Sequence, residues 1–432
     1  MANLLVLYWY RADYPMRATI RSHLYCFRRS RRHRTWYVNL AFCSPVSWLR
    51  RIRFDAVILH TLFSDGRADA ATYERRVRQV EWIRDLSCPK AFFPQDEYGW
   101  SNTLCDTIRR LRLHWVFTLA GPEDVARMYP GLEAEGVRFR RVLPGYLEPG
   151  LVRKLERLVA RHGERPVDIG YRSRPGPFYH GRHGLLKTRV ADVLQEGARR
   201  RGMRTDLSTD PRDTFLGMAW FHFMRRCKYV AGVEGGASLL DRDGTLTQRV
   251  RAFVAAHPEA SFEEVERECF PGLDGGLTYV AISPRHLEAC ATRTGQILVE
   301  GQYNGILRPG EHYLELKKDF SNLEAVLSAA QDDVARERMV NRAYDEVVRS
   351  GRFLYPHFVE EVLSALLPAA AAEGPGPRHG WTMWIVFSIL EKLSWLGVMA
   401  NAWFVAPAKK KLRPGWEALR RARTSAGAGK AR

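Results

Sequence analysis

One loop of the sequence combines glycines with the residue types that bind a diphosphate. It begins at Arg172, continues through Arg174 and a Pro/Gly-rich stretch, and reaches Lys187 on the helix that follows. Arginine offers bidentate charge, and a lysine near a helix start adds to the positive end of the helix. The loop therefore predicts a phosphate site, and a solvated basic loop is the alternative interpretation.

Two further segments carry residues that suit a nucleotide. Glu234 precedes Gly235 and Gly236, where paired glycines let a ligand approach the backbone, and the Glu234 carboxylate is a candidate acceptor for hydroxyl groups. A helix start near Pro284 carries Arg285 and Glu288. A carboxylate pointing from this helix into a cleft would suit the two hydroxyls of a ribose.

Asp241 and Asp243 raise the question of a metal site. The sequence Asp-x-Asp-Gly is more often a turn than a set of metal ligands, and the acidic residue that closes an EF-hand loop is missing. We expect neither a metal nor another cofactor.

These candidates follow apolar runs that alternate with helical stretches, which is typical of βα units and a parallel sheet. In the first part of the chain we expect strands at 3–10, 34–40, 54–59, 91–93 and 115–119. After a charged helix at 151–162 and a linker at 163–166, the rhythm restarts with strands at 167–172, 229–233 and 296–299, a helix at 185–201, and an inserted helical pair at 245–269.

The chain length of 432 residues also favours two domains. We predict an α/β fold of two Rossmann-like domains that face a cleft, at 1–150 and 165–350, with a closing helix at 351–367 and a linker at 368–380. Ligands of open parallel sheets bind beyond the carboxyl ends of the strands, so the cleft is the expected site.

The formal charge of +19 is concentrated at the two ends of the chain. Residues 1–60 carry eleven arginines against two aspartates, and residues 408–432 carry nine basic residues against one glutamate. Basic patches of this kind suit an anionic membrane surface, and a solvated helix end is the alternative for the first patch. A nucleic-acid partner is not expected, because no recognised binding motif accompanies the charge.

Residues 381–432 differ in composition from the rest of the chain. Trp381–Pro407 holds four of the twelve tryptophans and is almost wholly apolar, but Glu391-Lys392 interrupts it. Charges at the centre of a bilayer are costly, which favours a monotopic or re-entrant anchor over a span. The alternative is a helix packed on the protein's own core. Scattered cysteines and the lack of a secretory signal predict a reducing cytoplasm.

The motifs of the second half resemble those of GT-B glycosyltransferases, in particular the bacterial group related to spore-maturation proteins and common in surface-polysaccharide biosynthesis. Arg285-His286-Leu287-Glu288-Ala289-Cys290-Ala291 is similar to their R-x-x-E-x-x-A helix start, and residues 303–323 are similar to the segment that follows. The resemblance covers about 1–366. It departs at Val280, where many retaining relatives have a second glutamate.

The resemblance implies that Glu288 binds the nucleotide ribose, and that Arg172 and Lys187 bind the diphosphate of a sugar donor. In the first domain, His60 and Asp96 follow strands and would face the cleft. His60 is a candidate base or acceptor-orienting group, and Asp96 a candidate partner of an acceptor hydroxyl. For both, a structural role, as a core histidine or a helix cap, is the alternative.

The predicted function is transfer of a hexosyl group from a nucleotide diphosphate sugar to a glycan, lipid-linked or protein acceptor, without a metal. The expected location is the cytoplasmic face of the bacterial inner membrane. Two alternatives remain: a nucleotide-sugar epimerase of similar fold, and a catalytically silent glycan-binding or scaffold protein tethered by its tail.

Overall fold

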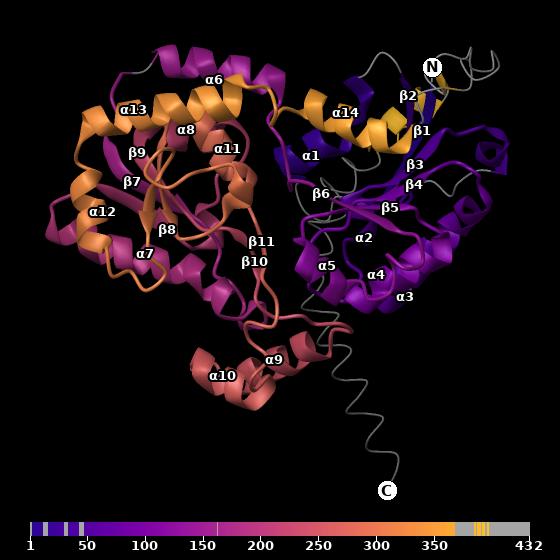
Figure 1. Cartoon of the computed structure of the whole chain (residues 1–432), viewed down its shortest axis with the longest axis horizontal. Coiled ribbons are helices and arrows are strands. Elements are labelled where there is room, and N and C mark those ends of the chain that lie inside the picture. The colour runs from indigo at the N-terminus through magenta and orange to yellow at the C-terminus, as the bar shows by residue number, and fades with distance from the viewer. Residues whose placement is uncertain are drawn as a thin grey trace, which may run out of the picture.

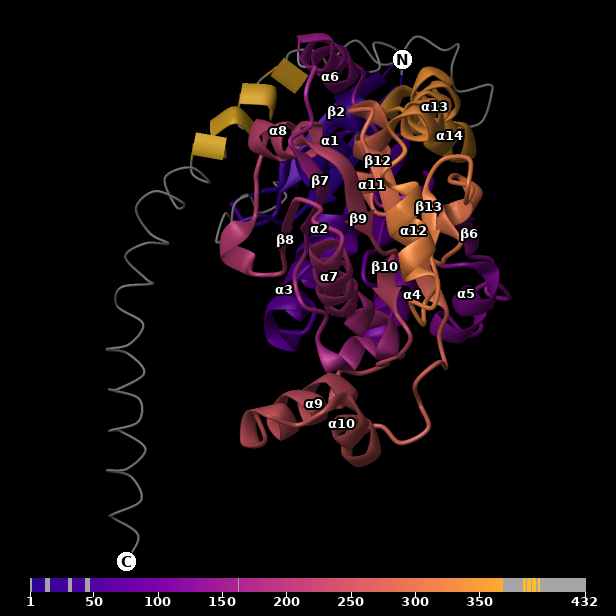
Figure 2. The ribbon, with the colours of Figure 1, turned by 90° about the vertical axis from the view of Figure 1, so that its left-hand side faces the viewer.

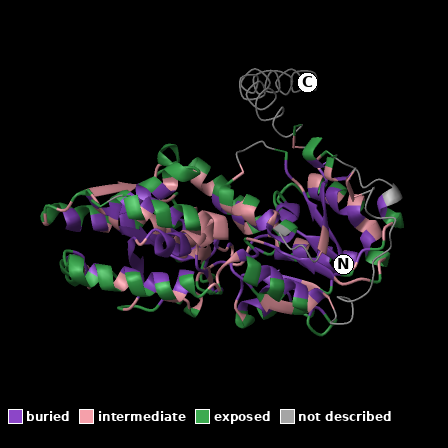
Figure 3. Cartoon of the chain, turned by 90° about the horizontal axis from the view of Figure 1, so that it is seen from above, coloured by how far each residue is buried: buried purple, intermediate pink, exposed green. Residues whose placement is uncertain are grey.

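The computed structural model shows two α/β domains side by side (Figure 1). It describes residues 2–11, 16–29, 33–42, 47–161 and 163–367, together with ten residues of the tail, namely 384, 385, 387–389, 391–393, 395 and 396. The buried residues gather on the strands and the inner faces of the helices of both domains, as the view from above shows (Figure 3). The predicted α/β class with two Rossmann-like units is confirmed.

Domain one contains a parallel six-stranded sheet in the order β2-β1-β3-β4-β5-β6. Its strands are β1 (Ala2–Tyr8), β2 (His33–Asn39), β3 (Ala56–Leu59), β4 (Lys90–Phe92), β5 (Trp115–Thr118) and β6 (Arg138–Arg141). The first five lie where the apolar runs predict them. β6 was not predicted, because three of its four residues are arginines.

The helices of domain one connect these strands in the βα pattern. They are α1 (Ala18–Leu24), α2 (Thr61–Ser64), α3 (Ala70–Val80), α4 (Ser101–Leu111) and α5 (Pro122–Met128). On α4, the buried residues Leu104, Ile108 and Leu111 recur at helical spacing and join the domain core.

Domain two contains a parallel five-stranded sheet in the order β13-β12-β9-β7-β8. The strands are β7 (Val167–Arg172), β8 (Thr205–Ser208), β9 (Cys227–Gly232), β12 (Gly295–Val299) and β13 (Leu314–Leu316). The short edge strands β8 and β13 were not predicted. A separate antiparallel two-stranded sheet, β10 (Gly235–Ala237) and β11 (Tyr279–Ala281), extends toward domain one.

The helices of domain two include the inserted pair that the sequence predicts. They are α7 (Arg182–Arg200), α8 (Met218–Arg226), α9 (Thr245–Ala256), α10 (Phe262–Cys269), α11 (Pro284–Ala291), α12 (Leu323–Ala329) and α13 (Asp333–Ala343). A capping box begins α10, because the side chains of Ser261 and Glu264 each accept a hydrogen bond from the other residue's backbone N–H.

The chain crosses between the domains twice, at neighbouring positions. The helix predicted at 151–162 is α6 (Pro149–Arg161), and its buried leucines belong to the core of domain two, so the junction lies before this helix rather than after it. The chain returns through α14 (Tyr355–Leu366), which packs on domain one. At the crossing, Leu147 N–H donates to the carbonyl of Phe353, and Tyr355 N–H donates to that of Leu147.

A buried carboxylate joins the two-stranded sheet of domain two to domain one. Glu97 accepts hydrogen bonds from the hydroxyls of Thr118 and Tyr129 at 2.5 and 2.7 Å, and from Leu119 N–H at 2.9 Å. A fourth donor, the hydroxyl of Tyr279 on β11, lies 3.1 Å away. We call these groups the Glu97 junction. All four donors find an acceptor in one side chain, so the junction is a satisfied polar network.

The described residues of the tail pack against domain one. Trp384 Nε1 donates to the carbonyl of Thr35 at 3.3 Å, Phe387 is buried against Trp36, and Glu391 forms an ion pair with Arg28. Among the described residues, no helix has both the length and the apolar composition needed to cross a bilayer. The described part of the tail thus matches the alternative of a helix on the protein's own core. The predicted linker at 368–380 and residues 397–432 lie outside the described residues.

Candidate active site

A cavity of about 460 Å³ lies between the two domains. Domain one contributes the segment at 17–20, the loop at Gln95 and Asp96, and Leu119. Domain two contributes residues that follow the ends of β7, β8, β9 and β11. The cavity therefore lies where parallel sheets bind ligands, at the carboxyl ends of the strands.

Asp96 and Lys187 lie near each other across the cleft. Both line the cavity, one from each domain, and each influences the pKa of the other. Burial among protein atoms raises the pKa of Asp96, against the influence of Arg67 and Lys187. Burial, together with the positive charge of Arg285, lowers the pKa of Lys187.

The loop that carries Asp96 is held in an unusual conformation. Asp96 has a positive φ of 52°, a region that few residues other than glycine adopt. Arg67 donates to the carbonyl oxygens of Asp96 and Gly99, the latter at 2.9 Å from Nε. This buried arginine fixes the loop so that one carboxylate faces the cavity while its neighbour, Glu97, faces the core.

Three arginines converge on the same cavity. Arg174 follows β7, Arg285 begins α11, and Arg17 precedes α1 in domain one. Burial and the charges of Arg174 and Arg285 lower the pKa of Arg17, so the guanidinium group of Arg17 is repelled by both of the others. Within the described ranges, the side chains of Arg17, Arg174 and Lys187 form no hydrogen bond or ion pair, whereas Arg285 donates to the carbonyl of Arg172 at 2.8 Å.

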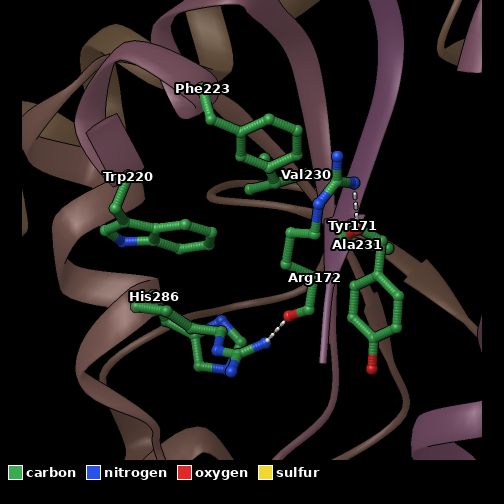
Figure 4. A pocket seen from close by; sticks show the side chains of 8 residues that line it. Tyr171, Arg172, Trp220, Phe223, Val230, Ala231 and His286 are labelled. Atoms are coloured by element: carbon green, nitrogen blue, oxygen red, sulfur yellow. Dashed lines mark hydrogen bonds between the residues drawn. The ribbon is translucent and has the colours of Figure 1, made fainter. Parts of the chain in front are cut away.

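Arg172 has a different role from the predicted one. Its guanidinium pairs with Asp206 at 2.5 Å and lies over the rings of Phe215 and Phe223. Figure 4 shows this side chain beside Phe223, with its carbonyl oxygen accepting from Arg285. Arg172 thus lines the cavity but holds Arg285 in place, and its own charge is already paired.

Glu288 lines the cavity from α11, as the resemblance implies. Its Oε2 accepts a hydrogen bond from Trp220 Nε1 at 2.8 Å. Burial raises the pKa of Glu288, while Trp220 and Arg285 act in the opposite direction. In the described part of the chain no donor binds Oε1, which leaves this atom available to a ligand hydroxyl.

The structure places His60 in the core and not at the cavity. It is about 1% exposed, its Nε2 lies 2.9 Å from His23 Nδ1, and its Nδ1 accepts from Leu62 N–H at the start of α2. Burial lowers the pKa of both histidines, that of His23 to about 4. The predicted role of His60 as base or acceptor-orienting group is therefore wrong; its two ring nitrogens serve the fold.

Glu234 is likewise structural, because its carboxylate accepts from the backbone N–H groups of Gln302 and Tyr303 at 3.1 and 2.7 Å. Gly235 and Gly236 line the cavity. Gly236 has a φ of 140°, and a Cβ there would lie 1.9 Å from the carbonyl oxygen of Tyr279. This glycine is therefore required by the β10–β11 pairing, whatever the ligand.

The turn interpretation of Asp241 and Asp243 is confirmed. Asp241 accepts from the N–H groups of Gly244, Leu246 and Thr247 and so caps α9, while Asp243 accepts from Thr245 N–H at 3.0 Å. Both carboxylates are engaged by the backbone at a helix start.

Sequence reasoning missed two residues of the site, Arg17 and Trp220. Arg17 belongs to the basic N-terminal region, whose charge was interpreted only in terms of a membrane. Trp220 lies nineteen residues after the predicted helix at 185–201 ends, and only its contact with Glu288 reveals its place.

No family model matches the chain, and no curated protein shows significant similarity to it. Several solved structures, however, are similar to the chain. HepE from Anabaena in complex with UDP-glucose is 12% identical over 85% of this chain and 100% of its own, with a TM-score of 0.42.

Two further solved structures are similar at the same level. A glycosyltransferase from Rickettsia africae is 10% identical over 84% of this chain and 97% of its own, with a TM-score of 0.39. A DNA-modifying β-glucosyltransferase is 9% identical over 84% and 99%, with a TM-score of 0.43. The resemblance to GT-B glycosyltransferases, and the narrower one to the spore-maturation group, stay predictions from the sequence motifs.

Proposed function

We propose that the chain is a glycosyltransferase that moves a hexosyl group from a nucleoside diphosphate sugar to an acceptor hydroxyl. One observation carries the proposal. Arg17, Arg174, Lys187 and Arg285 converge on one interdomain cavity, which also holds the carboxylate of Glu288. A cluster of cations that repel one another is stabilised by a multivalent anion, and a diphosphate supplies that charge.

Each residue has a role in the proposed reaction. Glu288 accepts hydrogen bonds from the ribose hydroxyls, and the cations bind the diphosphate. The acceptor oxygen forms a bond to the anomeric carbon as the bond from that carbon to the diphosphate oxygen breaks, and the electron pair leaves with the nucleoside diphosphate. Asp96 receives the hydroxyl proton, which its raised pKa favours.

The same cations argue for a reaction without a metal. A departing diphosphate needs preorganised positive charge at the developing oxyanion, and Lys187 with Arg174 and Arg285 supplies it. Activity should therefore persist in EDTA. Loss of transfer in EDTA, restored by Mg²⁺ or Mn²⁺, would contradict this part of the proposal.

The cellular setting is also proposed. The net charges of +9 over residues 1–60 and +8 over residues 408–432 support an anionic surface as partner. The setting would be the cytoplasmic face of the bacterial inner membrane, and the pathway the synthesis of a surface polysaccharide.

A screen of nucleoside diphosphate sugars by thermal unfolding tests the donor assignment. A ligand that binds only the native state raises the melting temperature. The correct donor should therefore raise it more than free sugars or nucleoside monophosphates do. The donor is then incubated with acceptors. Transfer supports the proposal, conversion of the donor to an epimer without acceptor supports the epimerase alternative, and binding without turnover supports the scaffold alternative.

A further inference from the structure

The exposed apolar side chains of this protein are concentrated in two segments. Nine large hydrophobic side chains are exposed in the described part of the chain, and six of them belong to these segments. The six, which we call the apolar face, are Phe215, Leu216 and Met218, and Ile389, Leu393 and Leu396; their exposed fractions lie between 36% and 61%. Single exposed hydrophobic residues need no explanation, but groups of them mark interaction sites.

The first group lies at the mouth of the candidate active site. Phe215 and Leu216 line the interdomain cavity, and Met218 begins α8 directly afterwards. The ring of Phe215 is also held against Phe223 and Arg172, so this rim is supported from within domain two. An acceptor entering the cavity at this rim would pass over apolar side chains.

The second group lies on the tail that is attached to domain one. Ile389, Leu393 and Leu396 follow one another at helical spacing and are exposed. Other residues of the same segment, Phe387 and Glu391, are buried against domain one. The attachment thus orients a stripe of apolar side chains away from the protein.

Both groups lie on the same side of the molecule. In Figure 2 the connection between β8 and α8 and the described tail residues, drawn in yellow, both lie at the left-hand edge. The first group belongs to domain two and lines the cavity, whereas the second belongs to the tail that packs on domain one.

Positive charge accompanies the apolar face. Lys392 is exposed within the tail stripe, Arg21 lies over the ring of Trp395, and Arg174 is exposed at the cavity. Apolar side chains flanked by lysine and arginine suit the interface of an anionic bilayer, where insertion and charge attraction act together.

We infer that the apolar face rests on an anionic bilayer, so that the acceptor reaches the cavity from the membrane and is lipid-linked. The inference rests on the proposed function and narrows its acceptor to one class. Contact on both sides of the cleft would hold the rim at 215–218 at the lipid interface, where the head group of a lipid-linked acceptor lies.

Flotation of the full chain with vesicles of phosphatidylglycerol and phosphatidylcholine tests the docking. We expect Met218→Asp and Leu393→Asp each to lower the lipid-bound fraction about tenfold, because a charge replaces an inserted apolar group. The matched control is Val334→Asp on α13, an equally exposed apolar residue outside the apolar face, which should float as the parent protein does.

Hydrogen exchange with and without vesicles separates docking of the whole face from attraction by the basic tail. Amides at 214–218 should exchange more slowly when vesicles are present. Binding that both Asp variants retain, that high salt abolishes, and that leaves 214–218 unprotected would overturn the inference.

Two further measurements distinguish the inference from the proposed function. The donor should raise the melting temperature of both Asp variants as it does that of the parent, since neither residue lines the cavity; a failure of every donor would instead overturn the proposed function. With labelled donor and vesicles that contain a solvent extract of bacterial membranes, we expect label in the organic phase. Label only in water-soluble glycans would overturn the lipid-linked acceptor.

Discussion

The two polar regions between the domains differ in how their charges are balanced. In the Glu97 junction one carboxylate accepts from four donors, three from domain one and one from domain two. In the cavity, by contrast, Arg17, Arg174 and Lys187 have no partner among the described residues and lie close enough to influence one another or Arg285. A region that satisfies its own polar groups stabilises the fold, while one that leaves like charges together is built for a ligand.

Adjacent residues give the sharpest test of this difference, and the largest expected effect. Glu97→Gln should lower the free energy of unfolding by about 2–5 kcal/mol, because the amide nitrogen of glutamine leaves two buried donors without an acceptor. Asp96→Asn, one residue away, should leave stability within about 0.5 kcal/mol, since its carboxylate faces the cavity. Urea denaturation of both variants measures this, and equal losses would remove the distinction.

Lys187→Ala should affect catalysis without harming the fold. Loss of a charged partner of the leaving diphosphate costs about 1.5–3 kcal/mol, which lowers kcat/KM for transfer roughly 10- to 150-fold. The unfolding midpoint should stay unchanged or rise, because a partly buried cation near Arg285 is removed. Arg189→Ala, an exposed residue on the same helix, is the control and should retain full activity. A destabilised Lys187→Ala with normal kcat/KM would show that the lysine serves the fold.

Glu288→Gln should weaken donor binding about fivefold, the difference between a charged and a neutral hydrogen-bond acceptor of roughly 1 kcal/mol. Donor affinity of the parent should also fall as the pH is lowered, because protonation removes the acceptor; burial raises the pKa of Glu288, so the fall should begin above the range usual for a glutamate. Titration calorimetry across this range checks both effects. A pH dependence that persists in Glu288→Gln would point to another group.

Arg17→Ala should have the smallest effect. Arg17 approaches the cavity from domain one, so its loss should raise the donor KM about three- to tenfold, as expected for a partly solvated charge contact of roughly 1 kcal/mol. The melting temperature without donor should not fall, because repulsion by Arg174 and Arg285 is relieved. Steady-state kinetics with the parent as reference test this, and an unchanged KM would show that domain two alone binds the diphosphate.

The sequence predicted those parts of the fold whose signals are local. Buried strands such as Ala56–Leu59 appear as apolar runs, and the Ser261–Glu264 cap is visible in the residues themselves. Edge strands lacked that signal: β6 is Arg-Phe-Arg-Arg, with two of its arginines over the ring of Trp115, and β8 is polar. The edge strands β6 and β8 form because of side chains and strands that lie next to them only in the folded sheet.

Five residues chosen for their own chemistry, namely Lys187, Arg174, Arg285, Glu288 and Asp96, line one cavity in the structure, and their roles there stay predictions. The predicted role was wrong for residues whose role depends on a partner far away in the sequence. His60 binds His23, and Glu234 binds backbone groups nearly seventy residues later. Arg172 was correctly placed at a strand end, but Asp206 and two aromatic rings already hold its charge. Arg17 could not be assigned because its neighbours in the cavity come from the other domain.

The double crossing between the domains has a consequence for the synthesis of the chain. Domain two is continuous in sequence, so the buried residues of its core have all been synthesised once the ribosome has passed Val348. Domain one is completed only later, because Tyr355, Phe358 and Leu366 of α14 belong to its core. During translation part of the apolar surface of the domain-one sheet therefore stays uncovered while domain two folds. The earliest residues to be made are thus among the last to be buried.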